Sequence, residues 1–98
     1  MRRRIRKVNP NRPEATLDPR YKVWRSAVRK RDKHHCRWPG CKCRKNLHTH
    51  HIRKWADYIL LRYEVSNGIT LCKEHHLIVG RDEAAYAPTL ILITAQKA

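Results

Sequence analysis

The sequence predicts a small α+β domain in which two short strands precede a helix and a metal ion helps to hold the fold. The first observation is the length, because 98 residues form one small domain with a thin core that often needs a staple such as a metal. The second is the set of four cysteines and seven histidines, all of which lie within residues 34–76. The third is a pair of short, partly β-branched segments, Leu47–Ile52 and Ile69–Cys72, with a helical segment directly after the second.

A basic arm and a helix precede this unit. Residues 1–15 are expected to form a flexible arm, because their positive charges repel one another and two prolines prevent a continuous helix. Asp18 and Pro19 are typical of a helix start, as N-cap and first helical residue, and the helix is expected to run to about Asp32. One face of it is expected to pack on the core, since apolar residues recur there at helical spacing: Tyr21, Trp24 and Val28.

The middle of the chain predicts the order strand, connector, strand, helix. Residues 34–46 are rich in Cys and Lys and are interpreted as a zinc knuckle that leads into the first strand. Residues 53–66 form a connector that is apolar enough to fold back on the core. Asn67-Gly68 is a turn signal before the second strand, and a short helix over Lys73–Val79 is expected to stop at Gly80.

Three segments follow from these elements: an arm over residues 1–15, a metal-stapled domain over residues 16–83 and a tail over residues 84–98. The tail is ambiguous. Its apolar run Leu90–Ile93 is compatible with a strand or with one helical turn after Pro88, packed on the domain or apart from it.

The charge is concentrated in the first half of the chain. The net charge is +15, and residues 1–45 hold 17 of the 23 basic residues but only 3 of the 8 acidic ones. This asymmetry predicts a polyanionic partner, and nucleic acid is the favoured one. The alternative is a merely solubilising tail. The residues expected to contact nucleic acid are Arg2, Arg3, Arg4, Arg6, Lys7, Arg25 and Arg29.

The sequence also bears on the cellular compartment. No run of 18 apolar residues predicts a transmembrane helix, and the arginines at positions 2–4 are not followed by the apolar stretch of a secretory signal. A cytoplasmic location without a membrane partner is expected, and there paired cysteines bind metal more often than they form disulfides.

Four residues have the spacing of a structural zinc site. Such sites hold Zn²⁺ tetrahedrally through two close ligand pairs on separate turns, and Cys36 with Cys41 and Cys72 with His75 supply two such pairs. Cys43 is a near neighbour that could replace Cys41, but the Pro-Gly step before Cys41 favours a tight return of the backbone there. The alternative is a set of reduced thiols without metal.

The remaining histidines complete a pattern that resembles the HNH endonucleases, the ββα-metal group. The resemblance covers roughly residues 21–83 and is closest to the small zinc-containing HNH proteins of phages and prophages. It rests on Tyr21, Trp24, Arg31-Asp32, Cys36, Pro39-Gly40-Cys41, Leu47, His50-His51-Ile52, Leu61-Arg62, Asn67–Cys72 and His75-His76. Asn67 follows His51 by sixteen residues and precedes His76 by nine, which suits the family pattern.

The resemblance implies a metal-dependent DNA endonuclease in which His51 is the general base. It implies that His50 and His76 bind a catalytic divalent ion and that Asn67 holds the loop and orients the base, or joins the metal shell. The ion is left open among Mg²⁺, Mn²⁺, Ni²⁺, Co²⁺ and Zn²⁺. Gly80 stands where colicin-type relatives have a further metal-binding histidine. His48, His34 and His35 are expected to be surface residues.

Two other functions stay open. One is a zinc-containing DNA-binding module with weak or no catalytic activity. The other is a protein that assists phage DNA packaging together with packaging proteins, in a bacterial or phage-infected cell. The basic half and the zinc ligands fit these functions equally well, whereas the set of His50, His51, Asn67 and His76 favours the nuclease.

Overall fold

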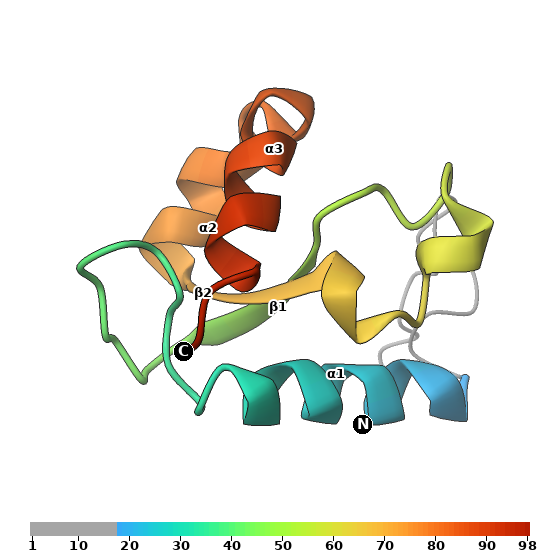
Figure 1. Cartoon of the computed structure of the whole chain (residues 1–98), viewed down its shortest axis with the longest axis horizontal. Coiled ribbons are helices and arrows are strands. Elements are labelled where there is room, and N and C mark those ends of the chain that lie inside the picture. Colours follow the sequence, from blue (N-terminus) through green and yellow to red (C-terminus); the bar gives the residue numbers. More distant parts are fainter. Residues whose placement is uncertain (1–17) are drawn as a thin grey trace, which may run out of the picture.

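The computed structural model describes residues 18–98 and has a two-stranded antiparallel sheet between helices. Helix α1 (Pro19–Arg31) lies on one side of strands β1 (Leu47–His51) and β2 (Gly68–Cys72), as Figure 1 shows. Helices α2 (Lys73–Gly80) and α3 (Glu83–Thr94) lie on the other side. The predicted α+β class is confirmed, whereas the arm over residues 1–15 lies outside the described residues.

Helix α1 begins as the sequence predicts. Asp18 is its N-cap and accepts a hydrogen bond from the Arg20 N–H at 2.8 Å, Pro19 is its first residue, and Asp32 caps its end. The inward face buries Trp24 and Val28. The Trp24 indole N–H donates to the Glu64 carbonyl at 2.8 Å, so the helix is tied to the chain just before β2.

A glycine lets α1 lie close to the sheet. Gly68 pairs with His51 at one end of the antiparallel register, in which Leu47 pairs with Cys72 at the other. A Cβ atom at Gly68 would lie 2.5 Å from Val28 Cγ2 and 2.8 Å from Trp24 Cζ2, closer than real Cβ contacts. The turn expected before β2 is present as a 3₁₀ turn (Val65–Asn67), but Gly68 is already the first residue of the strand.

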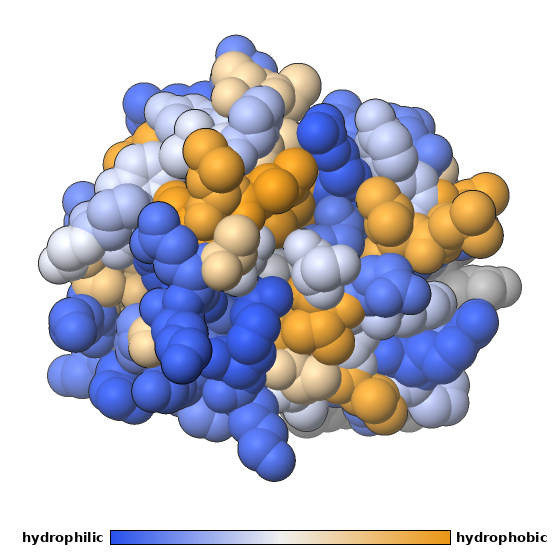
Figure 2. All heavy atoms as spheres, viewed as in Figure 1, coloured by the Kyte–Doolittle hydropathy of each residue, from blue (hydrophilic) through white to orange (hydrophobic). Residues whose placement is uncertain are grey.

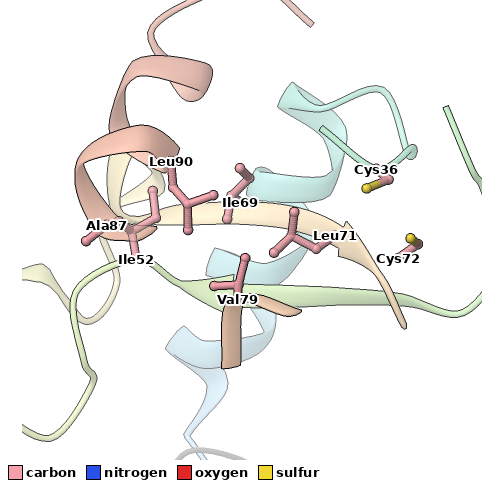
Figure 3. Packing of buried hydrophobic residues seen from close by; sticks show 8 residues of the cluster. All are labelled: Cys36, Ile52, Ile69, Leu71, Cys72, Val79, Ala87 and Leu90. Carbon is pink, nitrogen blue, oxygen red and sulfur yellow. The ribbon is translucent and has the colours of Figure 1, made fainter. Parts of the chain in front are cut away.

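The C-terminal segment is a helix that belongs to the core. Of the two alternatives for Leu90–Ile93, the strand is wrong and the helix is confirmed, but the helix is longer than one turn. Helix α3 has 12 residues and starts before Pro88, where the Asp82 side chain accepts from the Ala85 N–H. Ala87 and Leu90 reach the core beside β2 and α2 (Figure 3). The buried cluster consists of Cys36, Ile52, Ile69, Leu71, Cys72, Val79, Ala87 and Leu90.

A buried carboxylate joins four parts of the fold. Asp32 is fully buried and accepts hydrogen bonds from the Arg31 and Arg37 guanidinium groups and from the Thr70 N–H. Burial disfavours its charged form, but the bonds from Arg31, Thr70 and Arg37 outweigh burial and hold the pKa of Asp32 below its usual value. Arg37 also donates to the Ile93 and Gln96 carbonyls at the end of α3, so one ion cluster ties α1, the knuckle, β2 and α3 together.

The connector after β1 packs on the core only in part. Trp55 is buried, but Tyr58, Ile59 and Leu60 are 44%, 66% and 90% exposed, so the expectation that the connector folds back is wrong for its tip. A 3₁₀ turn, η1 (Ile59–Leu61), forms this tip.

Among the helices of residues 18–98, none has the length and apolar character that a membrane span requires.

Candidate functional site

Cysteine and histidine side chains from the two predicted pairs converge on one point. The ligand atoms of Cys36, Cys41, Cys72 and His75 all lie within 4.8 Å of one another. His75 Nδ1 is 3.5 Å from Cys36 Sγ and 3.2 Å from Cys72 Sγ. In a tetrahedral zinc site with its usual bond lengths, neighbouring ligand atoms are roughly 3.3 to 3.8 Å apart. The cluster can therefore hold a metal ion such as Zn²⁺, with His75 contributing Nδ1.

The knuckle turn brings the first pair to this point. Gly40 has φ +80, a conformation that favours glycine, and the Cys41 N–H donates to the Trp38 carbonyl at 2.8 Å to close the turn. Cys72 is the N-cap residue of α2, so His75 lies on the first turn of that helix. Cys43 is exposed and lies outside the cluster, with its Sγ 3.5 Å from the Lys45 carbonyl oxygen. This arrangement agrees with the choice of Cys41 over Cys43.

The surroundings of the cluster are apolar and aromatic. The Trp38 ring stacks on the His75 ring at 5.0 Å and 8°, and Tyr86 meets Trp38 edge-on. Burial raises the pKa of the Cys36 thiol to about 12. Ionisation of this thiol thus needs a nearby positive charge, which is what a divalent ion supplies to thiolate ligands.

A second group of side chains lines a polar cleft of about 330 Å³ at the edge of β1. The His76 ring of α2 stacks on His48 at 4.7 Å and 6°, and it meets His50 edge-on at 5.5 Å and 69°. Arg29 of α1 donates from Nε to Thr49 Oγ1 at 3.0 Å and from a terminal nitrogen to the Leu47 carbonyl at 2.9 Å. The residues lining the cleft are Tyr21, Arg25, Arg29, Leu47, His48, Thr49, His50 and His76.

The cleft combines two kinds of group. Imidazole nitrogens are metal ligands, and guanidinium groups bind phosphate. The structure thus brings His50 and His76 together, as predicted, with Arg25 and Arg29 beside them. His48, which was expected to be only a surface residue, also lines the cleft; its alternation with His50 along one strand was the signal for a shared face.

His51 lies on the other side of the strand from His50, under α1. Its ring stacks on Trp24 at 3.9 Å and 11°, and the residue is 4% exposed. Its Nε2 is 2.9 Å from the Arg62 carbonyl oxygen, which can only accept, so in the neutral ring Nε2 carries the proton and Nδ1 has the lone pair. His51 is not among the residues that line the cleft.

Asn67 fastens the two ends of the connector to each other. Its Oδ1 accepts from the Arg53 N–H at 2.8 Å, and its Nδ2 donates to the carbonyls of Arg53 and Leu61 at 3.1 and 3.2 Å. These bonds fix the residue before Arg62, whose carbonyl receives the His51 N–H. The geometry thus favours holding the loop and orienting His51 over direct contact with a metal.

The other predicted residues are placed as follows. Gly80 is the exposed last residue of α2, and a Cβ there would meet nothing within 4 Å. Arg2, Arg3, Arg4, Arg6 and Lys7 lie outside the described residues.

No protein-family model, curated protein or solved structure matches this chain.

Proposed function

We propose that this protein is a metal-dependent endonuclease of the HNH type that hydrolyses phosphodiester bonds of DNA. The observation that carries the proposal is the cleft in which His50 and His76 meet beside Arg25 and Arg29. A pair of imidazoles suits a divalent ion, and adjacent guanidinium groups suit the phosphates of a nucleic acid. The net charge of +15 supports the same partner.

Each residue has a role in this proposal. His50 and His76 would hold the divalent ion, which supplies counter-charge to the scissile phosphate and its leaving oxygen. Two histidine ligands favour Zn²⁺, Ni²⁺ or Co²⁺, whereas an otherwise open shell favours Mg²⁺ or Mn²⁺. Arg25 and Arg29 bind backbone phosphates and orient the strand.

His51 acts as the general base in this proposal. Its Nε2–H is directed at the Arg62 carbonyl, so Nδ1 is the atom that can take a proton from water. Asn67 is a positioning residue, because its bonds to Arg53 and Leu61 hold the segment that contains the Arg62 carbonyl. The Cys/His cluster has a structural task, as it clips the knuckle to the start of α2.

A second function is favoured by the burial of His51. His51 is covered by Trp24 and does not line the cleft, so it has little access to water there, and Gly80 offers no side chain to the metal. Both features suit a zinc-containing DNA-binding module of low activity that assists phage DNA packaging in the bacterial cytoplasm. The nuclease remains the main proposal, because a pure binder does not need the His50 and His76 pair.

A plasmid-nicking assay separates these two functions. Supercoiled DNA is incubated with the protein and Mg²⁺, Mn²⁺, Co²⁺ or Ni²⁺, and with EDTA as a control. The nuclease proposal expects open circles or linear DNA only with a divalent ion, and their loss in a His50→Ala, His76→Ala double variant. A His34→Ala variant removes an exposed histidine from the turn after α1 and should cut like the wild type. Metal-dependent binding without any cleavage would favour the DNA-binding module.

A further inference from the structure

The connector carries an apolar tip that the proposed active site does not use. Tyr58, Ile59 and Leu60 follow one another in the sequence and are 44%, 66% and 90% exposed. Figure 2 shows an apolar area at the right of the molecule, where Figure 1 draws this segment in yellow-green. A run of three exposed apolar residues costs solubility unless it has a function.

Hydrogen bonds hold the chain on both sides of the tip. Asn67 bonds to Arg53 and Leu61 on either side of the tip, and the Leu61 N–H donates to the Tyr58 carbonyl at 2.9 Å. Residues on the two sides of the tip also contact each other: the Arg62 guanidinium carbon lies 3.7 Å from the centroid of the buried Trp55 ring, and Arg62 Nε donates to the Trp55 carbonyl at 2.7 Å. The chain is therefore held in place both before and after Leu60, and the Leu60 side chain is exposed to solvent.

Charged groups of both signs lie around the tip, and Glu83 of α3 lines one pocket with Arg53, Lys54 and Asp57. Arg53 and Lys54 precede it and Arg62 follows it, against the acidic Asp57 and Glu64. Beyond the tip, the chain returns to α1 at Tyr63, whose hydroxyl donates to Asp18 at 3.2 Å and whose ring lies under the Arg20 guanidinium at 4.7 Å. The returning end of the connector thus lies against α1, and the net charge of +15 makes a polyanion with an apolar interior the partner that suits an apolar tip on this protein.

The position of the tip in the chain links it to the cleft. The connector starts at the end of β1, directly after His50 and His51. Arg25 of α1 lines the cleft, and Arg20 of the same helix, which is paired with Asp18, contacts the returning end of the connector, so α1 runs from the cleft to the base of the connector. A duplex that follows α1 from the cleft therefore meets the base of the connector that carries the tip.

We propose that Ile59 and Leu60 form a wedge that enters a base step of duplex DNA, while Arg53 and Lys54 contact the flanking phosphates. Proteins that insert Leu or Ile between base pairs do so from the minor groove, unstack the step and bend the duplex. The wedge deepens the proposed function, because it rests on DNA as the partner. It does not require cleavage.

The test compares two double variants that remove the same pair of side chains at different places. Ile59→Ala with Leu60→Ala shortens the wedge, and Ile91→Ala with Leu92→Ala removes an exposed Ile-Leu pair, 41% and 69% exposed, from α3. The probe is a set of duplexes with 2-aminopurine placed at successive positions, studied without added divalent ion. The wild type and the α3 variant should raise the fluorescence at one step by unstacking it. The tip variant should lose that signal and bind about tenfold more weakly.

Three results would overturn the wedge. One is an unchanged 2-aminopurine signal at every position with the wild type, and another is equal weakening by both double variants. The third is self-association of the wild type in ultracentrifugation that the tip variant abolishes, since the tip is then a protein contact. A wild type that unstacks DNA but never cuts it refutes the nuclease and leaves the wedge intact. A wild type that cuts without unstacking refutes the wedge alone.

Discussion

Replacing Gly68 by alanine tests how α1 is packed against the sheet and against His51. The added Cβ would lie 2.5 Å from Val28 Cγ2 and 2.8 Å from Trp24 Cζ2, and both of these residues are buried. Neither side chain has free space to move into, so helix and strand must shift apart. Overpacking of this kind costs about 1–3 kcal/mol, which for a domain of about this size lowers Tm by roughly 5–20 °C.

Gly80→Ala is the matched control. Gly80 lies in α2, and a Cβ there meets nothing within 4 Å, so alanine should be neutral or stabilise by up to about 1 kcal/mol through a smaller loss of backbone entropy. Thermal unfolding followed by circular dichroism at one pH and with zinc present measures both variants. Because Trp24 stacks on His51 at 3.9 Å, Gly68→Ala should also shift the His51 ring resonances in NMR spectra, whereas Gly80→Ala should not.

Equal Tm values for the two alanine variants would refute this reasoning. They would mean that α1 does not approach β2 as closely as described, and the stacking of Trp24 on His51 would lose its basis.

The remaining predictions concern metal and charge. Purified protein should contain about one zinc ion, and Cys72→Ser should lower zinc content and Tm sharply while Cys43→Ser should not; folded, zinc-free wild-type protein would refute the cluster as a zinc site. Asp32→Asn should destabilise by about 3–5 kcal/mol at neutral pH, because it leaves the buried Arg37 guanidinium and the partly buried Arg31 guanidinium without their counter-charge. Since the folded pKa of Asp32 is lowered, its contribution is complete above its unfolded pKa of about 4 and is lost as the pH falls through the folded value. Urea unfolding should therefore show the two proteins converging in acid, and a constant difference between pH 7 and pH 2 would contradict this. Gly80→His should lower the Co²⁺ or Ni²⁺ concentration for half-maximal cleavage, because residues 76 and 80 share a helix face; superimposable titrations would show that position 80 does not face the metal.

Local signals in the sequence predicted the elements that surround the site. Asp18 and Pro19 mark the start of α1 because capping is a short-range interaction, and the close ligand pairs marked the Cys/His cluster because each pair lies on one turn. The choice of Cys41 over Cys43 rested on the Pro-Gly step together with the ligand position that the resemblance implies, and the structure turns the Cys41 thiol inward.

Interactions between distant segments could not be predicted in the same way. Asp32 reads as the polar end of a helix, and only the folded chain shows that it receives Arg37 and that Arg37 reaches the end of α3. The sequence left α3 open between a strand and one helical turn because the apolar run after Pro88 lacks a helical period, and the full helix depends on the packing of Ala87 and Leu90 in the core. The burial of His51 beneath Trp24 depends on the absence of a side chain at Gly68, which lets α1 lie close to the sheet. The sequence does not show that Gly68 lies under α1, because the two segments are far apart in the chain.

The most direct test of the proposed nuclease is single-turnover cleavage of duplex DNA by the wild type and by His51→Gln. Glutamine keeps most of the buried volume against Trp24 and can still donate to the Arg62 carbonyl, but it cannot act as a base. The nuclease proposal predicts a rate at saturating metal about 10²–10⁴-fold lower, with DNA affinity and zinc content unchanged. A rate within about threefold of the wild type, or no cleavage by the wild type with any divalent ion, would contradict it.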